Sequence, residues 1–98
     1  MKYANYIRYV DDQEAIAAIR PAHRAYLADL LAQGKLAAAG PFTDGAGALF
    51  IYEAENADVA EEFAAKDPYT VGGVIAEHTI EPWQLVYSNT SLLQQSPG

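Results

Sequence analysis

The order of strand-like and helix-like segments is the feature that most constrains how these 98 residues can fold. Runs of aromatic and β-branched residues predict strands, and apolar residues three or four positions apart predict helices. Glycine and proline mark the turns between these segments. The predicted strands cover residues 3–10, 35–39, 48–53 and 74–87, and the predicted helical segments cover residues 11–34 and 56–67.

Two prolines predict interruptions inside these segments. Pro21 suits the first turn of a helix, so residues 11–19 are expected to form a short helical turn before a main helix that starts at Pro21 and ends at Gly34. Pro82 has no N–H to donate to a sheet, so the last strand is expected to stop at residue 80 and to resume over residues 83–87.

The resulting order is strand, helix, strand, strand, helix, strand. It is typical of a ferredoxin-like sandwich, an α+β fold in which two helices cover one face of a four-stranded antiparallel sheet. Residues 3–10 and 48–53 carry apolar side chains on both faces of their strands, so the face without helices needs its own cover. We expect that cover to be the same face of a second copy, in a homodimer packed sheet to sheet.

Length and charge limit the class of protein. The chain makes one domain over residues 1–87, followed by a tail over residues 88–98 that we expect to fray or to dock on a partner subunit. Its net charge of −7 and six scattered basic residues argue against nucleic acid or an anionic membrane as a partner. The lack of cysteine excludes disulfides and thiolate chemistry without fixing the compartment. Because the sequence shows no apolar leader and no apolar run of about 18 residues, we expect a soluble, cytoplasmic protein.

Two ionisable side chains interrupt otherwise apolar helix faces. Val59 and Phe63 define one face of the second helix, and Asp67 takes the next position on it. A proline follows Asp67, so this carboxylate should end the helix while pointing inward. His23 lies four residues before Leu27 on the apolar face of the first helix. A contact between His23 and Asp67 is therefore the first hypothesis for a site.

Such a pair suits acid/base chemistry. The ordinary pKa of histidine lies near neutrality, so His23 can both accept and release a proton, and Asp67 would orient its ring. The alternative is a buried hydrogen-bonded pair that only joins the two helices. The local pattern leaves both interpretations open.

Five further residues are candidates for substrate binding. Arg20 lies one turn before His23 and could bind an anionic oxygen, or could equally be solvated or paired with a nearby carboxylate. Tyr69 could stack on an aromatic substrate, or could close the core. Gly40, Pro41 and Phe42 could form the lip of a pocket, although turn geometry alone explains the first two.

Metal and cofactor sites have little support in the sequence. His23, Asp67 and His78 could in principle supply three ligands, but the spacing of metal-binding histidine motifs is absent. Phosphate loops, nucleophile elbows and dinucleotide glycine patterns are absent as well. We therefore expect no metal and no cofactor, and interpret His78 as a cross-strand or interface residue.

Several short blocks of the sequence resemble the YciI-like, or YCII-related, family of small α+β proteins. The resemblance covers about residues 1–87. The blocks that carry it are Arg20, Pro21, Ala22, His23, Tyr26 and Leu27; Gly34, Leu36, Ala39, Gly40 and Pro41; Asp67, Pro68, Tyr69, Gly73 and Val74; and Ile80, Pro82 and Trp83.

The resemblance implies a dimeric α+β barrel built from ferredoxin-like subunits, and it places the family's His and Asp pair on His23 and Asp67. It also implies a proton-transfer enzyme, since one relative is a dehydrochlorinase that acts on a chlorinated hydroxyhydroquinone. An isomerase or lyase acting on a small aromatic or lactone-like molecule is therefore our first hypothesis. The second is a non-catalytic module that binds a small ligand or a larger protein.

Overall fold

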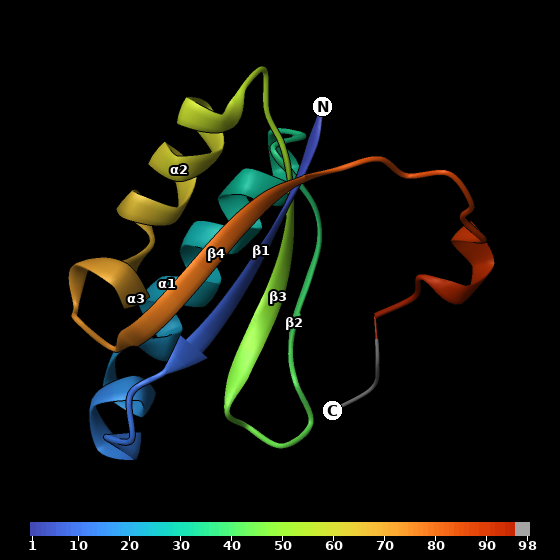
Figure 1. Ribbon diagram of the computed structural model, residues 1–98. Helices are drawn as coiled ribbons and strands as arrows, with labels where there is room; N and C mark the ends of the chain where they lie inside the picture. Colours follow the sequence, from blue (N-terminus) through green and yellow to red (C-terminus); the bar gives the residue numbers. More distant parts are fainter. Residues whose placement is uncertain (96–98) are drawn as a thin grey trace.

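The computed structural model describes residues 1–95 and is shown in Figure 1. Four antiparallel strands form one sheet in the order β2-β3-β1-β4, and the helices lie together on one of its faces. This arrangement confirms the predicted α+β, ferredoxin-like order of elements. The elements are β1 (Lys2–Tyr9), α1 (Gln13–Ala32), β2 (Leu36–Pro41), β3 (Gly47–Glu53), α2 (Ala57–Lys66), α3 (Pro68–Val71), β4 (Ile75–Trp83) and the 3-10 turn η1 (Thr90–Leu92).

Helix α1 is continuous, so the predicted break before Pro21 is wrong. Asp12 caps its start by accepting a hydrogen bond from the Ala15 N–H at 3.1 Å. Ile16, His23 and Leu30 are buried at intervals of seven residues and form one inward stripe that runs past the proline. Pro21 itself is exposed, so the backbone bond that it removes lies on the solvent side. Burial of the shared stripe outweighs the cost of the proline.

Strand β4 also passes through its proline, which corrects the predicted break at Pro82. The strand pairs with β1 from Ile75 to Trp83, with Pro82 opposite Tyr3. Because β4 is an edge strand, one side of its backbone has no neighbouring strand, and a missing N–H is tolerated there. The strand ends at Trp83, so residues 84–87 do not continue it.

The chain turns sharply between α2 and β4, as predicted. Asn56 caps the start of α2 and accepts a hydrogen bond from the Val59 N–H at 3.0 Å. Asp67 ends α2 in an extended conformation, and the four-residue helix α3 follows at once. Gly73 then adopts a φ of +75°, a left-handed conformation that favours glycine, and leads the chain into β4.

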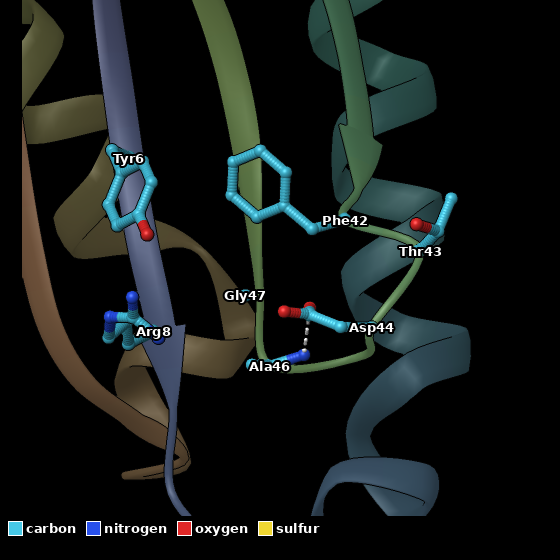
Figure 2. A pocket seen from close by; sticks show the side chains of 7 residues that line it. All are labelled: Tyr6, Arg8, Phe42, Thr43, Asp44, Ala46 and Gly47. Atoms are coloured by element: carbon cyan, nitrogen blue, oxygen red, sulfur yellow. Dashed lines mark hydrogen bonds between the residues drawn. The ribbon is translucent and has the colours of Figure 1, made fainter.

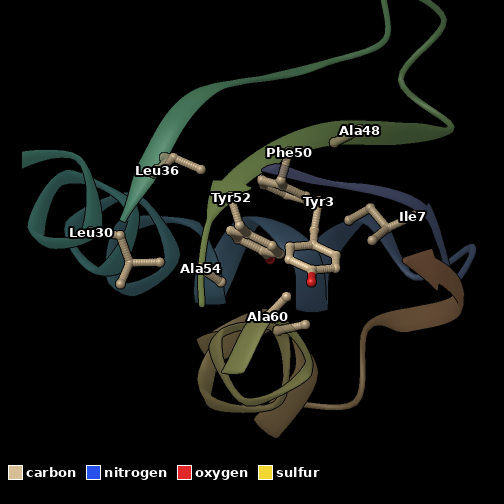
Figure 3. Packing of buried hydrophobic residues seen from close by; sticks show 10 residues of the cluster. Tyr3, Ile7, Leu30, Leu36, Ala48, Phe50, Tyr52, Ala54 and Ala60 are labelled. Atoms are coloured by element: carbon tan, nitrogen blue, oxygen red, sulfur yellow. The ribbon is translucent and has the colours of Figure 1, made fainter. Parts of the chain in front are cut away.

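The core lies between the sheet and the helices. Figure 3 shows Tyr3 and Tyr52 pointing from the sheet toward Ala60 of α2. The Tyr52 ring stacks at 6.2 Å from Phe50 and meets the ring of Phe63 edge to face at 5.7 Å. The small alanines of α2 let the helix approach these large rings closely.

No helix among residues 1–95 covers the opposite face of the sheet (Figure 1). We call this surface the open face. Tyr6, Leu49 and Trp83, which lie on it, are each exposed by about two fifths of their surface (42%, 38% and 43%). Beyond β4, the described tail leaves the body of the domain (Figure 1). The remainder of the predicted tail, residues 96–98, lies outside the described part of the chain.

Candidate active site

His23 and Asp67 meet between the helices and the sheet. The Nδ1 atom of His23 lies 2.7 Å from Oδ1 of Asp67. Only 6% of His23 and 4% of Asp67 is exposed. The contact joins the middle of α1 to the junction of α2 and α3, two segments separated by 44 positions in the sequence. The first hypothesis drawn from the two helix faces thus agrees with the geometry.

Asp67 is held by the backbone as well as by the histidine. Its Oδ1 also accepts a hydrogen bond from the Tyr69 N–H at 2.9 Å, which caps the start of α3. A carboxylate can only accept hydrogen bonds, so Nδ1 of His23 carries the proton in this contact. In the neutral imidazole, the other ring nitrogen, Nε2, then carries the free lone pair.

Nε2 of His23 has no hydrogen-bond partner among residues 1–95, yet it is not completely enclosed. In that part of the chain, Asn5 Oδ1 is the one fully buried side-chain polar atom without a partner. Nε2 therefore retains some contact with the surface, although the residue as a whole is buried. A ring nitrogen with a free lone pair and contact with the surface is what proton transfer by a histidine requires.

Aromatic rings surround the histidine. Tyr69 stacks on the His23 ring with 3.8 Å between centroids and 13° between planes, and Phe50 meets it edge to face at 5.8 Å. Arg20 donates from Nε to the Tyr69 hydroxyl at 3.3 Å. The structure therefore brings four predicted residues into one cluster, namely Arg20, His23, Asp67 and Tyr69.

Tyr9 belongs to the same cluster, although no local pattern in the sequence predicts it there. Its ring meets that of Tyr69 edge to face at 5.6 Å. Burial raises the pKa of Tyr9 above its usual range, the nearby Tyr69 and Asp67 raise it further, and the positive charge of Arg20 opposes the rise. Tyr9 thus stays a neutral hydroxyl at physiological pH.

Asn5 is the third buried polar residue among residues 1–95 and was also missed. It lies opposite Phe50 in the β1–β3 pair, and its Nδ2 donates to the Tyr52 hydroxyl at 3.2 Å while its Oδ1 has no partner. The alternation of β1 places Asn5 on the same face as Tyr3 and Ile7. A polar residue at an inward position of a strand was the signal that could have identified it.

The predicted pocket lip lies elsewhere. Phe42 packs against Tyr6 on the open face, with 5.2 Å between ring centroids, and lines a cavity of about 290 Å³ shown in Figure 2. Gly40 pairs with Leu49, so it also lies on the open face. Pro41 pairs with the buried Ala48, but Pro41 itself is exposed because β2 is an edge strand. The structure therefore does not bring Phe42 and Gly40 to His23. The cavity is lined by Tyr6, Arg8, Phe42, Thr43, Asp44, Ala46 and Gly47.

A second cavity, of about 530 Å³, lies where β4 ends. It is lined by Met1, Lys2, Pro82, Trp83, Gln84 and Leu85. Neither this cavity nor the one at Phe42 includes His23 or Asp67. His23 and Asp67 therefore form a buried polar cluster that neither of these two cavities reaches.

His78 lies apart from the cluster. Its Nε2 is 3.3 Å from Oε2 of Glu61, and both side chains are about half exposed. His78 therefore links β4 to α2 at the surface.

Within residues 1–95 no three His, Cys, Asp or Glu side chains gather as ligands for a metal ion. None of the helices in this range combines the length and apolarity needed to span a lipid bilayer.

The sequence profile of the YCII-related domain matches residues 1–84, so the chain belongs to that family. Protein YciI from Escherichia coli is 32% identical over 96 residues, which cover 84% of this chain and 98% of that protein. A relative from Haemophilus influenzae, named only as an uncharacterized protein, is 34% identical over 83 residues, covering 71% of this chain and 82% of its own. These matches confirm the resemblance drawn from the sequence blocks.

A solved structure of an enzyme has the same fold. It is 5-chloro-2-hydroxyhydroquinone dehydrochlorinase (TftG) from Burkholderia phenoliruptrix AC1100, in complex with 2,5-dihydroxybenzoquinone. The TM-score is 0.76 at 30% sequence identity, and the match covers 86% of this chain and 94% of that one.

Proposed function

We propose that the chain is an enzyme that transfers a proton on a small ring-shaped substrate, with His23 as the general acid/base. The observation that carries this proposal is the arrangement of the His23 ring. Nδ1 is fixed on Asp67 at 2.7 Å, while Nε2 is neither hydrogen-bonded within residues 1–95 nor fully enclosed. Nε2 would accept the substrate proton, and the Asp67 carboxylate would stabilise the resulting imidazolium.

The residues around the ring have separate proposed roles. Tyr69 stacks on His23 and limits how the ring can turn, so Nε2 keeps one direction. The Arg20 guanidinium would bind a substrate oxygen that carries negative charge, for example a phenolate. Its hydrogen bond to Tyr69 holds the guanidinium beside the histidine.

An elimination of hydrogen chloride fits this set of groups. In such a step the substrate gives one proton to Nε2 of His23, and the carbon–chlorine bond breaks with its electron pair leaving on chloride. No external oxidant or reductant is needed to balance that reaction. Support comes from the dehydrochlorinase TftG, which shares the fold at 30% identity. An isomerisation, in which His23 returns the proton to another atom, uses the same base.

A second candidate function is a non-catalytic module that binds a small ligand or a larger protein. The specific observation that favours it is the burial of the pair: neither cavity described above is lined by His23, and only 6% of this residue is exposed. The enzyme hypothesis requires that a substrate reach Nε2. Turnover separates the two candidates directly.

We also propose that the protein acts as a homodimer packed through the open face. Tyr6, Leu49 and Trp83 form an exposed apolar surface on a sheet whose other face is fully used by the core. Surfaces of this kind usually mark an interface. The proposed dimer does not change the residues assigned to proton transfer, which all lie on the helix side of the sheet.

Chloride release from chlorinated hydroxyhydroquinones tests the proposed function. We expect His23→Gln to lower the rate by at least about 100-fold, as is common when a general base is lost. The matched control is His78→Gln, because His78 is the other histidine of the chain and also contacts a carboxylate, Glu61. The control should stay within about twofold of the wild type. Equal loss in both variants, or none in His23→Gln, would contradict the assignment.

A further inference from the structure

Tyr9 is a partly buried tyrosine whose hydroxyl the fold does not use. The other four tyrosines that are not exposed each have a hydroxyl partner: Met1 for Tyr3, Phe63 for Tyr26, Asn5 for Tyr52 and Arg20 for Tyr69. The Tyr9 hydroxyl has no partner among residues 1–95, and it is not completely enclosed either. A tyrosine hydroxyl inside a protein normally finds a partner, so this one is a donor that is free for a ligand.

The ring of Tyr9 holds this hydroxyl in the active-site cluster. It meets the Tyr69 ring edge to face at 5.6 Å, and Tyr69 in turn stacks on His23 at 3.8 Å. Tyr9 is thus one ring removed from His23. Burial is the main cause of its raised pKa, and the further causes all belong to the cluster, namely Tyr69, Arg20 and Asp67. The hydroxyl therefore lies within electrostatic range of the residues that hold and orient the histidine.

A bulge in the sheet lies beside Tyr9. Arg8 pairs with Glu77 of β4, whereas Tyr9 pairs with Ile75, so Ala76 is left without an opposite residue. A bulge of this kind twists the strands locally and changes the direction of neighbouring side chains, and bulges are frequent next to active sites. The irregular pairing occurs where β1 reaches the active-site cluster.

Arg20 provides a second free group beside Tyr69. Its Nε atom donates to the Tyr69 hydroxyl at 3.3 Å, but the ion pairs among residues 1–95 do not include Arg20. The guanidinium is partly buried, and its two terminal nitrogens keep their donors for a ligand. A positive charge and a neutral hydroxyl, both without an acceptor in the described chain, complement a ligand that has two oxygens.

We propose that Tyr9 is a substrate-binding residue, which donates a hydrogen bond to a second oxygen of the ring while Arg20 binds the first. The inference rests on the proposed function, because it takes the substrate to be a small ring that meets Nε2 of His23. It narrows the substrate class to rings that carry oxygens at two positions. A ring with a single oxygen would leave the Tyr9 hydroxyl without an acceptor.

The hydrogen bond from Tyr9 also fits the proton transfer itself. When Nε2 of His23 takes a proton from a ring carbon, the electron pair of the broken C–H bond moves onto a conjugated ring oxygen. Negative charge on that oxygen strengthens the hydrogen bond that it accepts from Tyr9. Tyr9 keeps its own proton throughout, because burial raises the pKa of its hydroxyl. In an elimination, the electron pair then returns to the ring and the carbon–chlorine bond breaks to release chloride.

Tyr9→Phe removes the hydroxyl and keeps the ring. The ligand for the test is 2,5-dihydroxybenzoquinone, whose ring carries oxygens on opposite sides, and isothermal titration calorimetry measures its Kd. Loss of a hydrogen bond to an ionised oxygen should raise that Kd by about tenfold. The matched control is Tyr6→Phe, because Tyr6 lies on the same strand but is exposed on the open face. Its Kd should stay within about twofold of the wild type.

Unfolding in urea separates a binding role from a structural one. Because the Tyr9 hydroxyl has no partner within residues 1–95, Tyr9→Phe should leave the unfolding midpoint unchanged. Tyr26→Phe, which loses the hydrogen bond to the Phe63 carbonyl, should lower the midpoint and leave the Kd unchanged. The assignment is overturned if Tyr9→Phe loses stability as Tyr26→Phe does, or if it binds the quinone as tightly as the wild type.

A ring with a single oxygen tests the substrate class. Pentafluorophenolate has one oxygen, which we expect Arg20 to bind. Tyr9→Phe should keep the Kd of this ion within about twofold of the wild type, whereas Arg20→Gln should weaken the binding of both rings. Equal weakening of both rings by Tyr9→Phe would contradict the two-oxygen class.

Failure of this inference and failure of the proposed function give different results. A wild type that binds neither ring would overturn the role of Tyr9, while chloride release would still decide the proposed chemistry. If His23→Gln kept the full rate of chloride release, the proposed base would be wrong, while the Kd values would still decide whether Tyr9 contacts the ring.

Discussion

Substitution of Asp67 by alanine should destabilise the fold by about 2 to 3 kcal/mol. The change removes an acceptor that serves two donors, the His23 ring at 2.7 Å and the Tyr69 N–H at 2.9 Å. Leaving a buried ring N–H unpaired costs about 1–3 kcal/mol, and loss of a helix cap costs about 1 kcal/mol. Removal of a buried carboxylate also removes its desolvation cost, which offsets part of the loss.

Asp67→Asn is the informative companion variant. Its amide oxygen can still accept from both donors, so only the charge assistance disappears, and we expect a loss of about 1 kcal/mol. Asp12→Ala controls for capping alone, because the exposed Asp12 side chain accepts only the Ala15 N–H among residues 1–95. Its loss should also be about 1 kcal/mol.

Urea unfolding followed by circular dichroism measures all three variants. The expected order of stability is wild type, then Asp67→Asn and Asp12→Ala close together, then Asp67→Ala. If Asp67→Ala were no less stable than Asp12→Ala, the contact with His23 would contribute nothing to the fold. The buried pair would then have no structural role.

Two further predictions concern packing away from the pair. Tyr26→Phe removes the 2.7 Å hydrogen bond to the Phe63 carbonyl and should cost about 1 kcal/mol in urea unfolding. Burial raises the pKa of Tyr26 from 10.0 to about 12, so the wild type loses stability as the pH rises from 10 to 12. Tyr26→Phe has no hydroxyl to ionise there, so its stability should fall less over the same interval. Gly47→Ala should lower stability by about 2 kcal/mol or more, because a Cβ at this position would collide with the Ile7 carbonyl. Gly40→Ala, where a Cβ meets nothing within 4 Å, should stay within about 0.5 kcal/mol, and equal midpoints for the two glycine variants would contradict the close approach of β3 to β1.

The fold and the central pair could be predicted because each depends on local patterns that agree with one another. His23 and Asp67 each interrupt an apolar helix face, and only two helices are available to bury those faces. The two errors at prolines have one cause. Local rules for Pro21 and Pro82 describe an isolated segment, whereas the cost of a missing N–H depends on whether that side of the backbone faces solvent.

The surroundings of the pair could not be read from the sequence. Tyr9 reaches the cluster from β1, and Phe50 reaches it from β3, which no local spacing connects to α1. Phe42 was predicted at the lip of a pocket beside the pair, but it lies elsewhere because of the turn that it belongs to. It follows Pro41 at the end of β2, and the hairpin there directs its ring to Tyr6 on the open face. The direction of a side chain that follows a strand depends on the geometry of the turn. The sequence predicts where the strand ends but does not predict that geometry.

The nitrogen-15 spectrum of the histidine rings, recorded with and without 2,5-dihydroxybenzoquinone, tests whether His23 is the acid/base group that meets the ligand. The chain has only two histidines, so His78 serves as the internal reference. The account predicts that His23 carries its proton on Nδ1, that its Nε2 is free, and that the ligand moves the Nε2 resonance while His78 stays unchanged. A proton on Nε2 of His23 in the free protein, or a ligand that leaves both His23 resonances in place, would contradict it.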